Sequence, residues 1–143
     1  MKRYPAFAHV GLTGRNPTAL EAFYTKYFGF RRVRVLPVGQ NPIVFLKNSG
    51  GMYLEIFTAE LESPVPPPET DGPRFPGLRH LAFQVDDVDA ALKEMGEDAR
   101  ISLGPLSLDA FAPGWRAVWV RDPEGNIVEI SQGYRDEEGV QGI

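Results

Sequence analysis

The feature that most constrains this chain is an internal repeat. A shift of 74 residues lays residues 44–56 over residues 118–130 without a gap. Two kinds of residue recur at matched places, a histidine early in each half and a glutamate late in each half: His9, His80, Glu55 and Glu129. Self-similarity on this scale predicts two copies of one supersecondary unit that bury their apolar faces in the same way.

The first half predicts a β-α-β-β-β order. Residues 6–12 alternate as a strand does, and residues 18–28 carry apolar side chains at helical spacing. Asn16 and Pro17 are typical of a helix start, and Gly29 is typical of a helix end. Three strands are expected to follow, at residues 31–38, 43–47 and 52–58.

The pattern restarts after a proline-rich segment, residues 59–77, which we expect to be a linker or a surface loop. The elements expected after it are a strand at residues 79–85, a helix that begins after Asp86 or Asp87 and ends at Gly96, and a short strand at 100–103. Residues 104–114 are expected to form a loop, or a strand interrupted by one, and residues 118–131 a hairpin with its turn at 122–125.

Together these elements predict one α+β domain over residues 1–143. Module one covers about residues 5–58 and module two about residues 78–134, related as a pseudo-twofold repeat. Alternation along the strands places each repeated histidine and glutamate opposite the apolar residues that pack on the module's helix. All four side chains are therefore expected on the open, concave side of a mixed sheet.

Composition narrows the function classes. The chain has no cysteine, which excludes disulfides, a thiolate nucleophile and sulfur ligands for a metal. A net charge of -4, without a basic cluster, argues against a nucleic-acid partner. The sequence has no apolar run long enough for a membrane span. We expect a soluble, cytoplasmic protein that acts on a small molecule, with neither nucleic acid nor membrane as partner.

Two imidazoles and two carboxylates on one face suit a divalent transition metal. Nitrogen and hard oxygen donors without sulfur fit Zn, Ni, Co, Mn or Fe(II), and four protein ligands leave positions for water or substrate. Taken singly, a histidine or glutamate in a strand is more often structural or simply solvent-facing. That explanation accounts poorly for two matched pairs, but on the residues alone both interpretations stay open.

Four stretches carry a family resemblance: AHVGL, FYTKYFGF, LRHLAFQVDDVDAAL and RDPEGNIVEI. Together they resemble the vicinal oxygen chelate superfamily, which includes glyoxalase I, bleomycin resistance proteins and extradiol dioxygenases. The resemblance implies the glyoxalase-like fold and dimer formation. It also implies a divalent metal bound by His9, Glu55, His80 and Glu129.

The resemblance further implies a lyase or isomerase that moves a proton next to a metal-chelated oxygen of a small substrate. Glu129 and Glu55 are the catalytic candidates, because either could take and return that proton. We favour Glu129 on the resemblance. The candidates for substrate contacts are three cations and two aromatic residues: Arg116, Arg79, Arg121, Phe111 and Trp115.

Two other activities compete with this one. An Fe(II) dioxygenase of the extradiol type needs two histidines and one carboxylate, which His9, His80 and Glu129 would supply. Glu55 counts against it, because a fourth ligand closes a position that oxygen needs. A metal-free protein that binds drugs on the same fold has no need of the four residues, so their presence counts against it.

Overall fold

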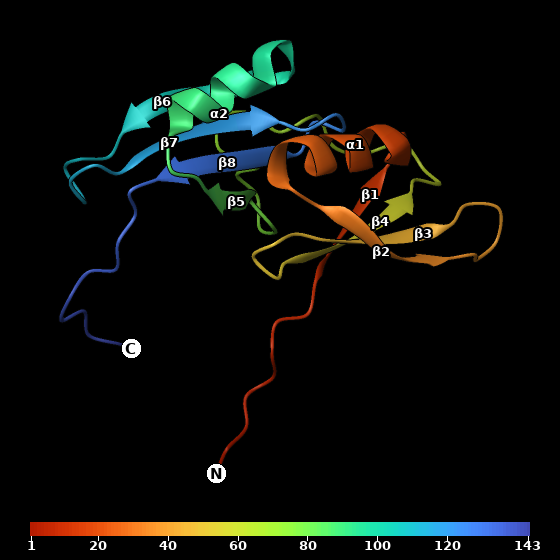
Figure 1. Ribbon diagram of the computed structural model, residues 1–143, viewed down its shortest axis with the longest axis horizontal. Helices are drawn as coiled ribbons and strands as arrows, with labels where there is room; N and C mark the ends of the chain where they lie inside the picture. The colour runs from red at the N-terminus through yellow and green to blue at the C-terminus, as the bar shows by residue number, and fades with distance from the viewer. The chain divides into compact units, whose positions relative to one another are not determined.

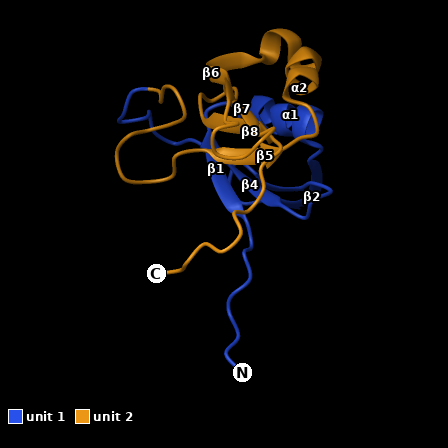
Figure 2. Cartoon of the chain, turned by 90° about the vertical axis from the view of Figure 1, so that its left-hand side faces the viewer, with its two compact units in different colours: residues 1–66 blue, residues 67–143 orange.

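The computed structural model describes the whole chain, residues 1–143. The chain divides into two compact units, unit 1 (Met1–Pro66) and unit 2 (Pro67–Ile143), which Figure 2 colours separately. Each unit contains a four-stranded mixed sheet and one α-helix. The expected α+β fold of two β-α-β-β-β modules is thereby confirmed. Neither helix has the length and apolar character that crossing a membrane requires.

Unit 1 follows the predicted order (Figure 1). Its elements are β1 (Val10–Gly14), α1 (Pro17–Phe28), β2 (Arg31–Leu36), β3 (Ile43–Lys47) and β4 (Tyr53–Thr58). The sheet order is β1-β4-β3-β2, with β1 parallel to β4 and the other neighbours antiparallel. Helix α1 buries an aromatic-rich stripe of Leu20, Phe23 and Tyr24, as its apolar spacing predicts.

Unit 2 repeats this arrangement (Figure 1). Its elements are β5 (Leu81–Gln84), α2 (Val88–Met95), a short 3-10 turn (Gly96–Asp98), β6 (Arg100–Ser107), β7 (Arg116–Arg121) and β8 (Ile127–Gln132). The sheet order β5-β8-β7-β6 matches that of unit 1 strand for strand, with the parallel pair again formed by the first and last strands.

The helix signals in the sequence work as capping groups. The Asn16 side chain accepts a hydrogen bond from the backbone of Ala19 at 3.0 Å, and Asp87 does the same for Ala90 at 3.0 Å. Gly29 ends α1 with a left-handed backbone, φ +69°. The side-chain caps pair backbone N–H groups at the helix starts, and the Gly29 N–H pairs with the Tyr24 carbonyl oxygen at the end of α1. The capping residues in the sequence therefore predicted these helix ends correctly.

Two strand boundaries correct the expectations. His9 and His80 lie immediately before β1 and β5 rather than within them. The parallel ladders begin one residue later, where Val10 pairs with Leu54 and Leu81 pairs with Val128.

The third strand of module two is also longer than expected. β6 extends to Ser107 instead of ending near residue 103, and its pairing with β7 contains two register shifts. A proline at position 105 is tolerated there because β6 is an edge strand, and edge strands accommodate proline and bulges.

The turn between β7 and β8 is built around a buried aspartate. Asp122 is fully buried, and its carboxylate accepts hydrogen bonds from the backbone amides of Glu124 and Asn126 and from the Asn126 side chain, at 2.8–3.0 Å. Gly125 takes φ +86°, a conformation that glycine adopts without strain. These contacts fix the hairpin register, and with it the face on which Glu129 lies.

The two glutamates lie between core residues, as alternation predicts. Leu54 and Ile56 flank Glu55 and are 0% and 1% exposed, while Val128 and Ile130 flank Glu129 and are 0% and 1% exposed. Each glutamate therefore points away from the helix-covered side of its own sheet, and its side chain keeps 16% exposure.

Candidate functional site

Each unit places one histidine and one glutamate together in the same way. In unit 1, Glu55 of β4 lies opposite Gly11 of β1, and His9 lies two residues before that glycine. In unit 2, Glu129 of β8 lies opposite Ala82 of β5, and His80 lies two residues before that alanine. The parallel register thus brings each imidazole diagonally across from its own carboxylate.

The unit 1 pair is close and open to solvent. The Nε2 atom of His9 lies 3.3 Å from Oε1 of Glu55, and the histidine side chain is 40% exposed. Phe45 of β3 lies directly opposite Glu55, and its ring meets the His9 imidazole edge-on with centroids 5.4 Å apart. The aromatic ring forms an apolar neighbour for both polar groups.

The unit 2 pair repeats this geometry with more burial. The Nε2 atom of His80 lies 3.9 Å from Oε1 of Glu129, and the histidine side chain is 21% exposed. Trp119 of β7 lies opposite Glu129, and its ring lies 6.3 Å from the His80 imidazole, centroid to centroid. Trp119 is only 7% exposed, and its indole N–H has no hydrogen-bond partner.

These aromatic partners were missing from the predicted site. The same 74-residue shift that matches the glutamates also matches Phe45 with Trp119. The signal was therefore present in the repeat, but an aromatic residue in a strand is ordinarily assigned to the core. Only the cross-strand register reveals that each one flanks a histidine–glutamate pair.

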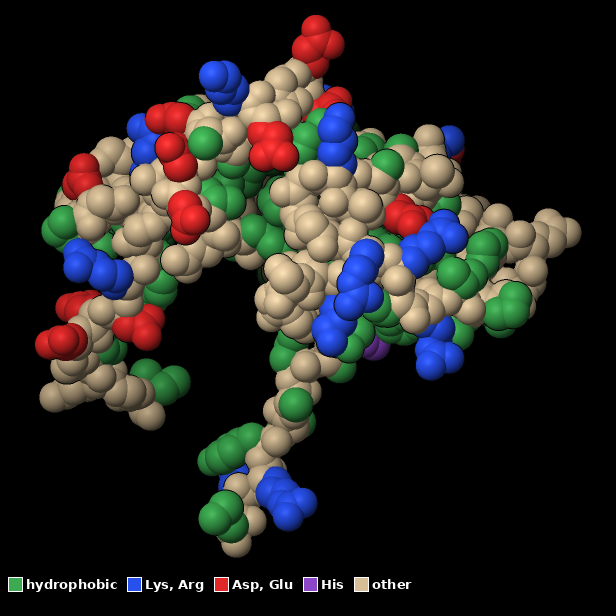
Figure 3. Space-filling model, viewed as in Figure 1, with side chains coloured by type: hydrophobic (Ala, Val, Ile, Leu, Met, Phe, Trp, Pro, Cys, Tyr) green, Lys and Arg blue, Asp and Glu red, His purple; other side chains and the backbone are tan.

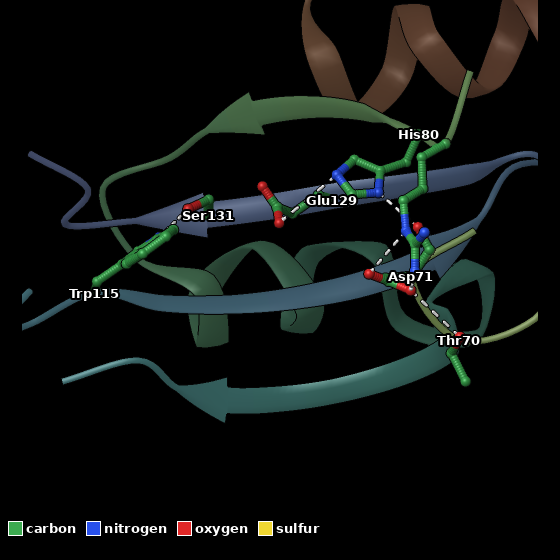
Figure 4. Close-up of polar contacts among 7 residues, drawn as sticks. Thr70, Asp71, His80, Trp115, Glu129 and Ser131 are labelled. Atoms are coloured by element: carbon green, nitrogen blue, oxygen red, sulfur yellow. Dashed lines mark hydrogen bonds and ion pairs between the residues drawn. The ribbon is translucent and has the colours of Figure 1, made fainter. Parts of the chain in front are cut away.

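His80 has a further contact that sequence reasoning missed. Its Nδ1 atom lies 2.6 Å from the backbone carbonyl oxygen of Asp71 (Figure 4). A carbonyl only accepts hydrogen bonds, so Nδ1 carries a hydrogen. Whenever the ring is neutral, the lone pair is therefore on Nε2, the atom that faces Glu129. A histidine that binds a metal through one nitrogen typically donates from the other to such an acceptor.

The segment that supplies this carbonyl, residues 67–79, is more than the linker expected there, and we call it the brace. The Asp71 carboxylate accepts two hydrogen bonds from Arg79, at 2.9 and 3.1 Å (Figure 4). This guanidinium holds the pKa of Asp71 below its usual range. Gly72 has φ +131°, and a Cβ there would lie 2.0 Å from the Arg79 carbonyl oxygen. The brace therefore closes tightly on the residue before His80, and only glycine fits at that contact.

Burial changes the acidity of Glu129. Desolvation raises the pKa of its carboxyl above the ordinary value, the charge of His80 acts in the opposite direction, and the charge of Asp71 adds to the rise. A half-buried carboxylate with a raised pKa is a stronger base than an exposed one. This is a property that a proton-transferring group needs.

The five expected substrate contacts lie in different places. Arg116 pairs with Asp89 of α2 at 2.8 Å, on the helix-covered side of the unit 2 sheet. Arg79 belongs to the brace. Arg121 donates to the carbonyl oxygen of Pro68 at 3.3 Å. The structure thus gives each of the three cations a partner within unit 2.

The two aromatic candidates lie in the loop between β6 and β7. The indole N–H of Trp115 donates to the Ser131 hydroxyl at 2.9 Å (Figure 4). Ser131 lies two residues beyond Glu129 on the same strand and hence on the same face. Phe111 is 79% exposed, and its ring lies edge-to-face with that of Trp115 at a centroid distance of 6.5 Å. Trp115 is therefore the one of the two that borders the Glu129 face.

The donor chemistry of each pair fits a divalent metal, because imidazole nitrogen and carboxylate oxygen are both ordinary ligands. The free Nε2 lone pair of His80 supports that fit. Each pair supplies two donors, and the structure contains no group of three or more histidine, aspartate or glutamate side chains that could hold a metal ion.

Comparisons with known proteins give the same assignment as the fold. Protein YaeR of Escherichia coli is 29% identical over 129 residues, covering 85% of this chain and 92% of that protein. The crystal structure of SMU.1112c has 29% identity and a TM-score of 0.67, covering 90% of this chain and 99% of that one. The fosfomycin resistance protein FosX of Listeria monocytogenes has 15% identity and a TM-score of 0.68, covering 95% and 97%. The family model described as Glyoxalase/Bleomycin resistance protein/Dioxygenase superfamily matches residues 6–130, and the chain belongs to that superfamily.

Proposed function

We propose that this protein is a divalent-metal-dependent enzyme of the glyoxalase type, a lyase or isomerase. It transfers a proton at a carbon next to a carbonyl or hydroxyl oxygen of a small substrate. The observation that carries the proposal is the duplicated histidine–glutamate pair, set at equivalent register positions in the two units. A purely structural role for one histidine or one glutamate does not explain why both residue types recur at equivalent positions in the two units.

The candidate ligands are the imidazole and the carboxylate of each pair: His9 and Glu55 in unit 1, and His80 and Glu129 in unit 2. Imidazole nitrogen and carboxylate oxygen are ordinary ligands of a divalent transition metal, and the coordination positions that they leave open would take substrate oxygens. A solved FosX of Listeria monocytogenes, 14% identical to this chain, carries Mn(II), which supports a divalent metal on this fold.

When bound, the metal supplies a positive charge that stabilises negative charge on the substrate oxygen. The chain's own contribution is the proton transfer. Glu129 takes the proton from the carbon beside that oxygen and returns it to the adjacent carbon. Its raised pKa suits it to this task, since burial disfavours the ionised form and strengthens the base. The Asp71 carbonyl holds the His80 ring with Nε2 available as a ligand.

The test measures metal binding in chelator-treated protein by calorimetric titration with Mn²⁺ and Co²⁺. The variants are Glu55→Gln and Glu129→Gln, which keep side-chain size and remove the charge. Glu62→Gln is the matched control, because Glu62 is a surface carboxylate paired only with Arg15. We expect each ligand variant to weaken metal binding at least about 100-fold and the control to leave it unchanged.

Activity separates the two roles of glutamate. With a panel of small α-hydroxycarbonyl compounds in D2O, we expect wild-type protein to exchange the C–H proton next to the carbonyl, as followed by NMR. Glu129→Gln abolishes that exchange even at saturating metal. If wild-type protein binds none of the divalent metals with which it is reconstituted, the proposal is wrong. The alternative is then a metal-free protein that binds a small molecule.

A further inference from the structure

A row of residues leads from the unit 1 pair to a cation at the sheet edge. Glu55 of β4 lies opposite Phe45 of β3, and Phe45 lies opposite Arg34 of β2. Directly opposed residues share one face of a sheet, and neighbouring strands are about 4.8 Å apart. The backbone of Arg34 is therefore about 10 Å from that of Glu55, with the Phe45 ring between them.

A groove of about 280 Å³ lies along this row. Four residues line it, a cation and three apolar or aromatic side chains: Val33, Arg34, Phe45 and Tyr53. Two consecutive residues of β2 reach the groove because pairing with β3 shifts register between Arg32 and Arg34. The lining combines apolar walls with one charged group, a composition typical of small-molecule sites.

The charge on this groove has no partner within the protein. Arg34 is exposed and forms neither an ion pair nor a hydrogen bond. Arg32, two residues away, instead holds Glu21 of α1 with two hydrogen bonds of 2.5 and 2.9 Å. Lys and Arg side chains gather over β2 in the space-filling view (Figure 3). The ammonium of Lys47 on β3 lies 5.0 Å from the Tyr53 ring centroid. An anionic ligand complements such a surface.

The second unit lacks this cation. In its equivalent row Glu129 lies opposite Trp119, and Trp119 lies opposite Leu103. Leu103 packs on the apolar cluster that contains Trp119. The residues that both units share are those that suit a metal, whereas the cation at the end of the row is present only in unit 1. A ligand that contacts both the histidine–glutamate pair and Arg34 would therefore lie across the unit 1 sheet with its anionic end at Arg34.

We propose that the groove lined by Arg34, Phe45 and Tyr53 binds the oxyanion of a small substrate whose planar or apolar body lies against Phe45. The substrate class is an aromatic or otherwise flat carboxylate or phosphate of about the size of phenyl phosphate. Arg34 pairs with the oxyanion, and the other end of the molecule reaches Glu55. This proposal names a substrate class for the proposed enzyme. It rests on the proposed function only where it places the other end of the substrate at Glu55.

The test uses the full chain without metal, so that it does not depend on metal binding. Phenyl phosphate, inorganic phosphate and benzyl alcohol are titrated into the protein and followed by ¹H–¹⁵N NMR. We expect phenyl phosphate to bind about tenfold or more tightly than either of the other two, and to shift the signals of Arg34 and Phe45. Arg34→Gln weakens phenyl phosphate binding by about tenfold or more, the value of a charge-assisted pair.

The matched control is Arg32→Gln, which removes the same charge from the same strand but from the side that holds Glu21. We expect it to bind phenyl phosphate within about twofold of wild type. If both variants weaken phenyl phosphate binding equally, binding depends on diffuse charge and the proposal is wrong. Unchanged binding of phenyl phosphate by Arg34→Gln would also overturn it, and so would equal affinity of wild-type protein for phenyl phosphate and inorganic phosphate. Because no metal is present, binding of phenyl phosphate at Arg34 can be demonstrated even if the proposed metal-dependent function is wrong. Likewise, failure to bind phenyl phosphate would leave the metal-dependent function untouched.

Discussion

The two units carry the same pair of donors in different surroundings. In unit 1 the histidine side chain is 40% exposed and the row beside it ends in a free cation, Arg34. In unit 2 the histidine is 21% exposed, its ring is held by the Asp71 carbonyl, and the row ends in Leu103. The shared residues are the paired donors, whereas the differing residues give unit 1 an exposed cation and unit 2 a hydrogen-bonded imidazole beside a carboxyl group whose pKa burial raises.

The largest effect should come from removing the histidine of either pair. We expect His9→Ala and His80→Ala each to lower the metal content of reconstituted protein, because each variant removes an imidazole ligand. Elemental analysis measures the metal content per chain. An unchanged content in either variant would contradict the role of that histidine as a ligand.

The brace provides the next largest effect. Gly72→Ala places a Cβ against the Arg79 carbonyl, so we expect the free energy of unfolding to fall by about 2–4 kcal/mol. Urea denaturation measures it. Gly77→Ala is the control in the same segment, because Gly77 also has positive φ but a Cβ added there would meet no atom within 4 Å. Its loss should be smaller, about 1–2 kcal/mol, because only the backbone strain of a non-glycine residue at that φ remains. Equal losses would mean that the brace contact does not matter.

Protonation of Glu129 gives a smaller, pH-dependent effect. Its pKa is raised in the folded state by burial, so folding is favoured when it is protonated. That advantage is present below the unfolded pKa, about 4.3, and is lost as pH rises through the folded pKa. We therefore expect Glu129→Gln to be more stable than metal-free wild type at pH 7, with the difference vanishing near pH 3. Urea unfolding at both pH values measures it, and a difference independent of pH contradicts the assignment.

The two tryptophans of unit 2 allow the smallest test. Trp115→Phe removes an indole N–H that donates to Ser131, which should cost about 1 kcal/mol beyond the lost volume. Trp119→Phe removes an N–H without a partner, so it should cost less than Trp115→Phe by about that amount. Thermal unfolding compares them. Equal costs would show that the Trp119 donor is satisfied in solution.

Much of the fold could be predicted from the sequence, because its signals are local. Asn16, Asp87 and Gly29 mark helix ends through contacts within a few residues, and strand alternation assigns Glu55 and Glu129 to the face opposite the core. The predicted face for both glutamates was confirmed, whereas the sequence left the extent of β6 beyond residue 103 open. Edge strands with bulges carry no clear periodicity, so the sequence could not define that strand.

The sequence by itself determined the repeat, and hence the two histidine–glutamate pairs, since duplication leaves matched residues at fixed spacing. The tertiary structure alone decided what surrounds each pair. The Asp71 carbonyl reaches His80 through a backbone atom, which no side-chain pattern reveals. Arg34 joins the row of Glu55 only through cross-strand register. Such contacts depend on the register between strands and on how closely two backbone segments approach, and local sequence periodicity predicts neither.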